Sequence, residues 1–574
     1  MIERTGKTRL GAALLSTVGM VLSCPDYDLW WLGFVQWIPW FWAIEGATPR
    51  RAFLFAWVTG FATVFWGFSW MSVLLTKFAG LPLPAAVPVS ALFAAWHGSL
   101  WGFAGLLTTI IRRRTGFSVL WVAPMCWIAV EAVLPNIFPI YMALSWAWQP
   151  LWIQTAELGG VTMVSGLMVA INAALYELLR VWLDTKRVDR RAAVVSAVLL
   201  VGTPVYGAIR IASVQARMNA AEKLNFAVVQ GNMSILEMRR RDRKLGILSK
   251  QQQETGRLQA QGANIALWGE TAYPNSRAFR RDSTRDLPDN AAWKVQRGFD
   301  IPVLFGAVTR PRKGEGRYPF NTAILLDGEG KVAGMYDKVY RLAFGEYAPL
   351  VDPKWYLEKF PNAAHIAQGE GASVLELDGK YRLGPFICYE DILPRFVRQA
   401  ALQRVHVFVN LTNDAWFGLT HEPMQHLGLA VFRTVEHRKG LVRSVNTGVS
   451  TYIDPTGRAI HKTKATDPDT QGPQAVDGFL ASVPMMDPDS STLYGMTGEG
   501  FNGLMVLGVL IAGFWRRRET DESGSGLGPD AGPDAGTVSD VGTGWGKAEG
   551  PDSGAESDDG EGEDERSDDT DASG

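Results

Sequence analysis

The stretch that decides the fold of this chain is RLGPFICYEDILP, residues 382–394. The apolar run that ends at Ile387 predicts a buried strand, and the polar residues after Cys388 predict a turn or helix. A cysteine between a strand end and a helix N-terminus gains thiolate character from the local dipole. We therefore take Cys388 as the candidate nucleophile of this chain.

On both sides of this stretch, short β-branched runs alternate with polar helical patterns, which is typical of a layered α/β or α+β domain. Strands are predicted over residues 224–229, 264–268, 301–308, 322–326, 383–388, 405–411 and 449–453. Helices are predicted near residues 233–260, 283–298, 392–403 and 422–438. The sequence has no G-x-G-x-x-G after a strand and no P-loop, so neither type of nucleotide site is predicted.

The cysteine and histidine content argues against two other kinds of protein. Three cysteines are too few for a disulfide scaffold. The seven histidines are scattered, and the five-residue spacing of His421 and His426 does not place them on one helical face as metal ligands. We interpret these two histidines as structural or surface residues.

The first 212 residues have a different composition, with few charges and 16 of the 22 tryptophans. A membrane-spanning helix needs about 20 mostly apolar residues. Stretches of this kind cover residues 9–24, 29–45, 52–74, 85–111, 117–134, 158–183 and 192–212, and an eighth covers 500–515. The sequence thus predicts a polytopic helical membrane bundle of about eight spans, with tryptophans such as Trp37 and Trp40 in interfacial belts.

Basic residues fall beside alternate stretches, which fixes an orientation through the positive-inside rule. The clusters are Arg4, Lys7 and Arg9; Arg50 and Arg51; Arg112, Arg113 and Arg114; Lys186, Arg187, Arg190 and Arg191; and Arg516, Arg517 and Arg518. Loops 25–28, 75–84 and 135–157 carry little positive charge. We expect both termini in the cytoplasm and residues 213–498 on the opposite side of the membrane.

The chain is therefore divided into seven transmembrane helices (1–212), an extracytoplasmic domain (213–498), an eighth helix with a basic cytoplasmic end (499–518) and a disordered acidic tail (519–574). The tail has 18 acidic and 2 basic residues, while the rest has 40 acidic and 54 basic ones. A tail of this composition cannot bury enough apolar surface to fold. We interpret it as a solvated cytoplasmic extension, with binding of a basic partner as the alternative.

Two features of the membrane part have more than one interpretation. The sequence VLSC at residues 21–24 resembles a lipoprotein cleavage site that ends at Cys24, but it also fits a first transmembrane helix that ends at Pro25. Glu131 and Glu177 lie inside apolar spans, where carboxylates are functional candidates, although both also fit a position near the headgroups.

Two other predicted strand ends offer the groups that a thiol nucleophile needs. Glu270 follows a buried strand in WGETAYP (268–274), and it is a candidate general base. Lys338 and Glu346 lie in an aromatic-rich loop over residues 337–347, and the lysine is a candidate oxyanion stabiliser. A single glutamate or lysine at a strand end is most often a solvated side chain. The prediction of an active site therefore depends on the combination of these residues with Cys388.

Together these motifs resemble the apolipoprotein N-acyltransferases, which are membrane members of the nitrilase (carbon–nitrogen hydrolase) superfamily. The matching segments are WGETAYP (268–274), DK through FGEY (337–347), CYE (388–390), NDAWFG (413–418) and NTG (446–448). The resemblance covers about residues 10–515 and implies a nitrilase-like α-β-β-α sandwich. This chain departs from the family over Met233–Arg240 and at Ala343, where the family usually has proline, which leaves the lid and substrate details open.

The resemblance implies a catalytic triad of Glu270, Lys338 and Cys388, with Glu346, Tyr389 and Glu390 in supporting or substrate-binding roles. The implied reaction is a two-step acyl transfer from a phospholipid, through a Cys388 thioester, to the α-amine of the N-terminal cysteine of a diacylated lipoprotein. No metal, organic cofactor or nucleic-acid partner is implied. The implied location is the bacterial cytoplasmic (inner) membrane, with the catalytic domain on the periplasmic side.

Two other functions remain open at this point. A membrane-tethered amidase or nitrilase would use the same triad to hydrolyse a small amide, but the eight-span body favours a lipid substrate. A non-enzymatic lipid transporter or scaffold would tolerate Cys388→Ala with no effect beyond stability.

Overall fold

The computed structural model describes residues 3–77, 79–234, 240, 242–349, 351–360, 364–472 and 474–515. The chain divides into two units between residues 517 and 518, and all of the described residues belong to the first unit. The basic cluster Arg516–Arg518 and the predicted acidic tail lie outside the described residues. The helices and strands below all belong to the first unit.

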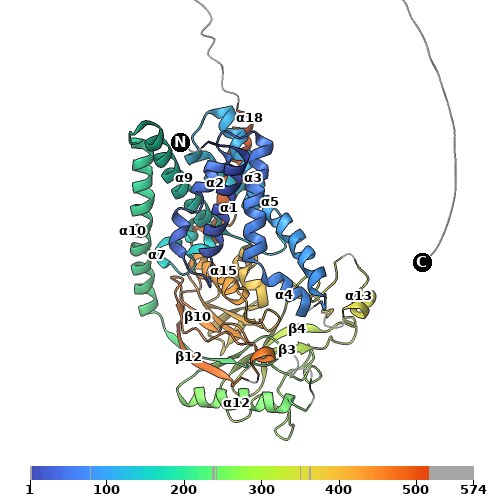
Figure 1. The fold of residues 1–574 in the computed structure, drawn as a ribbon. Helices are drawn as coiled ribbons and strands as arrows, with labels where there is room; N and C mark the ends of the chain where they lie inside the picture. The colour runs from blue at the N-terminus through green and yellow to red at the C-terminus, as the bar shows by residue number, and fades with distance from the viewer. Residues whose placement is uncertain are drawn as a thin grey trace, which may run out of the picture. The chain divides into compact units, whose positions relative to one another are not determined.

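Helices build the N-terminal part of the chain and its last described segment, drawn in the upper half of Figure 1. The longer ones are α1 (Gly6–Leu22), α3 (Pro49–Gly67), α4 (Trp70–Lys77), α5 (Leu83–Thr115), α6 (Val119–Val133), α9 (Val161–Thr185), α10 (Arg190–Ala220) and α18 (Gly500–Phe514). Short segments connect them: η1 (Trp30–Phe34), α2 (Ile38–Ile44), η2 (Met142–Trp146), α7 (Pro150–Ile153) and α8 (Ala156–Gly159).

Several of these helices suit a membrane, but the count of eight spans remains a prediction. Among the described residues, α5, α9 and α10 are long and apolar enough to cross a bilayer, and α3 with α4 forms a fourth span if the 52° bend between them is allowed. The helices α6 and α18 are apolar but have only 15 residues each. The predicted stretch 29–45 is a 3₁₀ turn followed by the seven-residue α2, which is too short to span by itself.

The membrane helices pack closely where small residues meet. A Cβ atom on Gly60 of α3 would lie 2.5 Å from the carbonyl oxygen of Gly98 on α5, so the two backbones touch. The expected interfacial position is wrong for Trp37 and Trp40, which are at most 1% exposed and pack edge to face with each other. Their rings also pack against the buried side chains of Trp127 and Phe41, so they belong to an aromatic cluster inside the bundle.

The two carboxylates inside the apolar spans are both held by the protein. Glu131 of α6 accepts hydrogen bonds from the Trp127 indole, the Ser165 hydroxyl and the backbone N–H of Met142. Glu177 of α9 pairs with Arg180 at 2.6 Å and accepts a hydrogen bond from Ser118. These contacts join neighbouring helices, and they give both residues a structural role.

The described strands of the remaining chain form two six-stranded sheets. The first has the order β12-β1-β2-β3-β4-β5, with β1 (Lys223–Gln230), β2 (Ile265–Trp268), β3 (Val303–Thr309), β4 (Phe320–Leu326), β5 (Val332–Asp337) and β12 (Asp477–Pro484). The second has the order β11-β10-β9-β8-β7-β6, with β6 (Leu375–Leu377), β7 (Tyr381–Ile387), β8 (Val407–Thr412), β9 (Gly440–Val445), β10 (Thr451–Ile453) and β11 (Ala459–Ile460).

The two sheets face each other, because β1 and β2 contact β9 and β4 contacts β7. The helix α12 (Lys244–Ala260) covers the outer face of the first sheet, at the bottom of Figure 1. The helices α14 (Pro394–Leu402) and α15 (Glu422–His437) lie on the side of the second sheet, and α15 also contacts α8 and η2 of the helical part. This α-β-β-α arrangement confirms the predicted layered α/β domain.

Strands β1 to β3 and β7 to β9 are parallel neighbours, so their carboxyl ends gather at one edge of each sheet. The remaining helices are short: α13 (Pro353–Lys359), α16 (Pro468–Gln471) and α17 (Leu493–Thr497). The helix predicted over residues 283–298 is wrong, because this segment has no helical turns. The Asp286 carboxylate instead accepts hydrogen bonds from the backbone N–H groups of Val295 and Gln296, which replaces the helical pattern.

Candidate active site

Cys388 lies directly after strand β7, at the first position of the five-residue 3₁₀ turn η3 (Cys388–Ile392). Its φ angle is +58°, a left-handed conformation that is costly for a residue with a side chain. The Asn410 side chain on the neighbouring strand β8 donates a hydrogen bond of 2.9 Å to the Cys388 carbonyl. The strand end and this bond together hold the partly buried thiol at a sharp corner of the chain.

Lys338 follows strand β5, and its side chain is 1% exposed. Its ammonium Nζ lies 3.2 Å from Oε1 of Glu270 and 2.9 Å from Oε1 of Glu346. Glu270 lies two residues beyond strand β2, and its backbone N–H donates to the Thr412 carbonyl at 3.3 Å. The structure thus brings together the lysine and both glutamates that the sequence singled out.

Glycine is needed beside Glu270 because strand β3 passes very close to this loop. A Cβ atom on Gly306 would lie 2.5 Å from the backbone nitrogen of Thr271 and 2.7 Å from the Cα atom of Glu270. Any larger residue at this position would push the Glu270 loop away from Lys338.

Asn321 is a residue of this site that the sequence analysis missed. It lies on the fully buried strand β4, and its Nδ2 donates to Oε1 of Glu270 at 2.7 Å and to Oε1 of Glu346 at 3.2 Å. The Asn321 carbonyl also accepts a hydrogen bond from the Lys338 backbone N–H at 2.8 Å. A polar side chain inside the apolar run FNTAILL was the available signal, since buried amides need partners.

Glu390 connects the nucleophile turn to the lysine loop. One carboxylate oxygen accepts hydrogen bonds from the backbone N–H groups of Val339 at 2.7 Å and Tyr340 at 2.9 Å. The other accepts from the Ile387 backbone N–H at 2.8 Å and the Tyr336 hydroxyl at 2.6 Å. Four donors on one buried carboxylate fix the residues next to Lys338 against the residue before Cys388.

Tyr389 and Glu346 also contact this loop. The Tyr389 hydroxyl donates to the Arg341 carbonyl at 3.0 Å, and the Lys338 ammonium lies 5.9 Å from the centre of the Tyr389 ring. The second carboxylate oxygen of Glu346 accepts the Leu342 backbone N–H at 2.9 Å. All six residues named from the sequence therefore lie around one small region.

The charges in this region are unbalanced, because two carboxylates share one ammonium. Burial raises the pKa of Glu270, and the nearby charge of Glu346 raises it further while Lys338 opposes the change. Burial alone lowers the pKa of Lys338, but Cys388 in its ionised form and the carboxylates of Glu270 and Glu346 outweigh burial and raise that pKa. The lysine therefore stays positive, and Glu270 is a more basic carboxylate than usual.

The expected thiolate character of Cys388 is wrong for the resting site. Burial raises the pKa of the thiol well above its usual value, and the nearby carboxylates raise it further, although Lys338 opposes them. The short 3₁₀ turn after Cys388 offers few aligned N–H groups, and the helix α14 begins only at Pro394. Cys388 is therefore a neutral thiol until a base removes its proton.

Two families match the chain in sequence. The family described as "Apolipoprotein N-acyltransferase N-terminal domain" matches residues 16–174, in the helical part. The family described as "Carbon-nitrogen hydrolase" matches residues 210–471, which include Glu270, Lys338 and Cys388. The fold and the site thus define a carbon–nitrogen hydrolase domain, of the nitrilase superfamily, joined to apolar helices.

Relatives with the same two parts are known from several bacteria. The apolipoprotein N-acyltransferase of Geobacter metallireducens is 29% identical over 468 residues, which cover 78% of this chain and 85% of that protein. That of Rhodopseudomonas palustris is 28% identical over 539 residues, which cover 89% of this chain and 96% of that protein. This chain belongs to the apolipoprotein N-acyltransferase family.

Solved structures align with part of this chain only at low similarity. Saccharomyces cerevisiae Nit3, a member of branch 10 of the nitrilase superfamily, is 16% identical and covers 48% of this chain and 93% of its own, with a TM-score of 0.33. A score this low adds nothing to the family assignment.

Proposed function

We propose that this membrane enzyme N-acylates lipoproteins, by moving an acyl chain from a phospholipid to the lipid-modified N-terminal cysteine. The observation that carries the proposal is the meeting of Glu270 and Lys338 at 3.2 Å beside Cys388, in a chain whose other half is apolar helices. Family membership supports the lipoprotein as acceptor. The proposal that a phospholipid is the acyl donor is supported by the apolar helices and by the chemistry of the site.

In the first half-reaction, Glu270 takes the proton of the Cys388 thiol as sulfur attacks the ester carbonyl of the phospholipid. The raised pKa of Glu270 suits this step, because a more basic carboxylate accepts the proton of a neutral thiol more readily. The Lys338 ammonium stabilises the tetrahedral oxyanion. When the ester C–O bond breaks, Glu270 returns the proton to the leaving lysophospholipid oxygen and the acyl chain remains as a thioester.

In the second half-reaction, the neutral α-amine of the lipoprotein cysteine attacks the thioester carbonyl. Glu270 takes a proton from the attacking nitrogen, and the Lys338 ammonium again stabilises the oxyanion. When the C–S bond breaks, the sulfur leaves with the proton that Glu270 returns to it. The products are an amide and the original neutral thiol, so no metal or redox partner enters the balance.

The other residues of the site act by position. Glu346 and Asn321 hold the lysine and the base, and the like charge of Glu346 makes Glu270 more basic. Glu390 holds the lysine loop against the nucleophile turn. Tyr389 holds the lysine loop at Arg341 through its hydroxyl group.

The location and topology are part of the same proposal. The basic clusters predict cytoplasmic termini, a sheet domain (213–498) on the periplasmic face of the bacterial inner membrane, and transmembrane helices on either side of it. Both substrates are anchored in the bilayer, so a site at the membrane surface meets them without removing them from lipid. The acidic tail (519–574) remains a proposed solvated extension.

Hydrolysis of a small amide is the competing function, because the same three residues support it. Transfer to an amine is favoured over hydrolysis here by the apolar helices, which a soluble-substrate amidase does not need. A lipid transporter is less consistent with the site, since a buried Glu–Lys–Cys group has no role in moving lipid.

Intact-mass analysis of the purified enzyme tests the proposal. With phospholipid alone, we expect a gain of one acyl chain on Cys388 and no gain in Cys388→Ala. Adding a diacylated lipopeptide should discharge the thioester and give a triacylated peptide. A discharge that yields only free fatty acid would support the amidase instead, and unchanged function in Cys388→Ala would support the transporter.

A further inference from the structure

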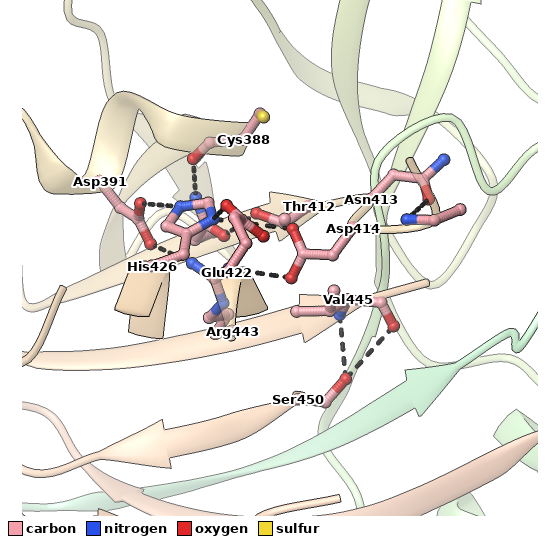
Figure 2. Close-up of polar contacts among 12 residues, drawn as sticks. Cys388, Asp391, Thr412, Asn413, Asp414, Glu422, His426, Arg443, Val445 and Ser450 are labelled. Carbon is pink, nitrogen blue, oxygen red and sulfur yellow. Dashed lines mark hydrogen bonds and ion pairs between the residues drawn. The ribbon is translucent and has the colours of Figure 1, made fainter. Parts of the chain in front are cut away.

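Behind the nucleophile turn lies a second group of charged side chains, buried on every side (Figure 2). Its members are at most 2% exposed and come from four segments: Asp391 of η3, Asp414 after β8, Glu422 and His426 of α15, and Arg443 of β9. The mechanism above uses none of them. Figure 2 also shows the sulfur of Cys388 pointing away from this group, so these residues do not touch the reacting atom.

Asp391 is the centre of this group, because both of its oxygens are bound. Oδ1 lies 3.0 Å from Nε2 of His426, and Oδ2 accepts a hydrogen bond of 2.6 Å from Nη1 of Arg443. Asp391 is three residues from Cys388 in the same short turn. A shift of this carboxylate therefore moves the backbone that carries the nucleophile.

The remaining two carboxylates make longer contacts. Nδ1 of His426 lies 3.6 Å from both Asp414 and Glu422, and Nη2 of Arg443 lies 3.5 Å from Asp414. These distances are short enough for electrostatic contact but too long for direct hydrogen bonds. Asp414 therefore balances charge around His426 and Arg443, while Asp391 makes the directed contacts.

The buried group contains more acidic than basic side chains. Three carboxylates face one guanidinium and one imidazole. Burial raises the pKa of Glu422 to about 8, and Asp414 adds to the increase. Burial and Arg443 oppose protonation of His426, but Asp391 and Asp414 outweigh them and raise its pKa to about 9. Both shifts favour the protonated form of each residue, which offsets the surplus of carboxylates in the group.

The same helix that carries His426 is bound to the membrane helices. Gln425 of α15 donates through Nε2 to the carbonyl of Gly67, the last residue of α3, at 2.9 Å. Its Oε1 accepts the indole N–H of Trp70, the first residue of α4, at 2.9 Å. Gln425 thus holds the point where α3 and α4 bend by 52°, next in sequence to His426.

We infer that Asp391, His426 and Arg443 form an ionic clamp, a set of positioning residues that holds the Cys388 turn in register with Glu270 and Lys338 and ties it through α15 to the membrane helices. The inference rests on the proposed function for what the positioned thiol does. A misplacement of about 1 Å in a reacting group costs on the order of 100-fold in rate, which is the effect the clamp prevents.

The arrangement favours a clamp over a cation site. The ligand atoms of Asp414, Glu422 and His426 lie within 4.8 Å of one another, a spacing that a metal ion also needs. However, the Arg443 guanidinium lies 3.5 Å from Asp414 and supplies positive charge that a metal would otherwise bring.

The test uses the full chain in detergent micelles with three measurements. The first is the rate of acyl gain at Cys388 from phosphatidylethanolamine. The second is the rate of alkylation of the Cys388 peptide by iodoacetamide, which needs no lipid. The third is the midpoint of thermal unfolding. The first two report the position and reactivity of the thiol, and the third reports structural damage.

We expect Asp391→Asn and His426→Asn each to slow acyl gain about 10-fold to 100-fold and to slow alkylation in parallel, with little change in the unfolding midpoint. The double variant should be no slower than the worse single variant, because both changes break the same contact. Two controls should stay within about twofold of wild type. Glu422→Gln mimics a protonated Glu422, and His437→Asn changes another buried histidine of α15 outside the clamp.

Three results would overturn the clamp: wild-type rates in both single variants, multiplying effects in the double variant, or loss of rate that only follows loss of the unfolding midpoint. If Asp391→Asn fails to fold, His426→Asn and His426→Gln decide the question, because both remove the imidazole Nε2 that contacts Asp391. Absence of acyl gain in wild type would defeat the proposed function alone, since the alkylation rates would still test the clamp.

Discussion

Two groups of buried charges lie on either side of the Cys388 turn, and both contain one carboxylate more than they contain cations. In the candidate active site, Glu270 and Glu346 face Lys338. In the clamp region, Asp391, Asp414 and Glu422 face His426 and Arg443. The same surplus has different consequences because of where the extra carboxylate lies. Glu270 lies beside a thiol and can exchange a proton with it, whereas Glu422 keeps its proton away from the reaction.

The sharpest way to break this comparison is to neutralise the surplus carboxylate in each group. Glu270→Gln removes the base and should slow acyl gain on Cys388 by about 10²–10⁴, the usual contribution of a general base. Glu422→Gln should change the rate by less than about twofold, because glutamine resembles the protonated form already present. Single-turnover mass spectrometry measures both, and similar losses in the two variants would contradict the distinction.

The positive charge of Lys338 should also matter for the reaction rate. Lys338→Met removes the charge that stabilises the oxyanion, and a loss of about 10²–10³ in acylation rate is expected. Without the lysine, its two partners Glu270 and Glu346 would repel each other, which could disturb the site by itself. Lys338→Arg keeps the positive charge and is therefore the matched control. We expect the arginine variant to recover part of the rate, and an equal loss in both variants would argue that geometry matters more than charge.

The link between the two groups is Glu390, which accepts four hydrogen bonds across the turn. Glu390→Gln places an amide N–H₂ against N–H donors, so at least one bond is lost. We expect a loss of about 1–3 kcal/mol in the free energy of unfolding, together with an acylation rate lower by about 10-fold. Chemical denaturation and single-turnover kinetics measure the two effects, and a stability loss with unchanged rate would limit Glu390 to a structural role.

The pH dependence of acylation should show the basicity of Glu270 directly. A general base works only when it is ionised, so the rate falls as the pH falls through the pKa of Glu270. Because burial and the charge of Glu346 raise that pKa, the fall should begin above the range of an ordinary glutamate, with about tenfold loss per further pH unit. Glu346→Gln removes the like charge and should move the midpoint to lower pH. An unmoved midpoint would mean that another group controls the fall.

Much of the fold could be predicted because each element carries its own pattern. The strand before Cys388 and the strand before Glu270 are short apolar runs that end at polar residues, and both appear in the structure where predicted. The strand β5 before Lys338 was not predicted, because most of its residues are only half-buried and its sequence has no continuous apolar run. The segment 283–298 was mispredicted because its polar pattern resembles a helix. The contact that prevents a helix, from Asp286 to Val295, joins residues whose pairing no local pattern shows.

The membrane part illustrates a second limit. Apolar composition identified the stretch 29–45, but composition does not show that the chain turns within it to form η1 and α2. The burial of Trp37 depends likewise on which helices surround it. Hydropathy reports preference for an apolar environment, and it does not distinguish lipid from the interior of the bundle.

The sequence by itself determined the family, the candidate triad residues and the division into apolar helices and a layered sheet domain, because these depend on motifs and composition that are local in the chain. Only the tertiary structure decided that Cys388 rests as a neutral thiol, that Asn321 joins the two glutamates, and that Asp391 is held by His426 and Arg443. The physical reason is that burial and long-range pairing set the energy of a charge, and both depend on residues distant in the chain.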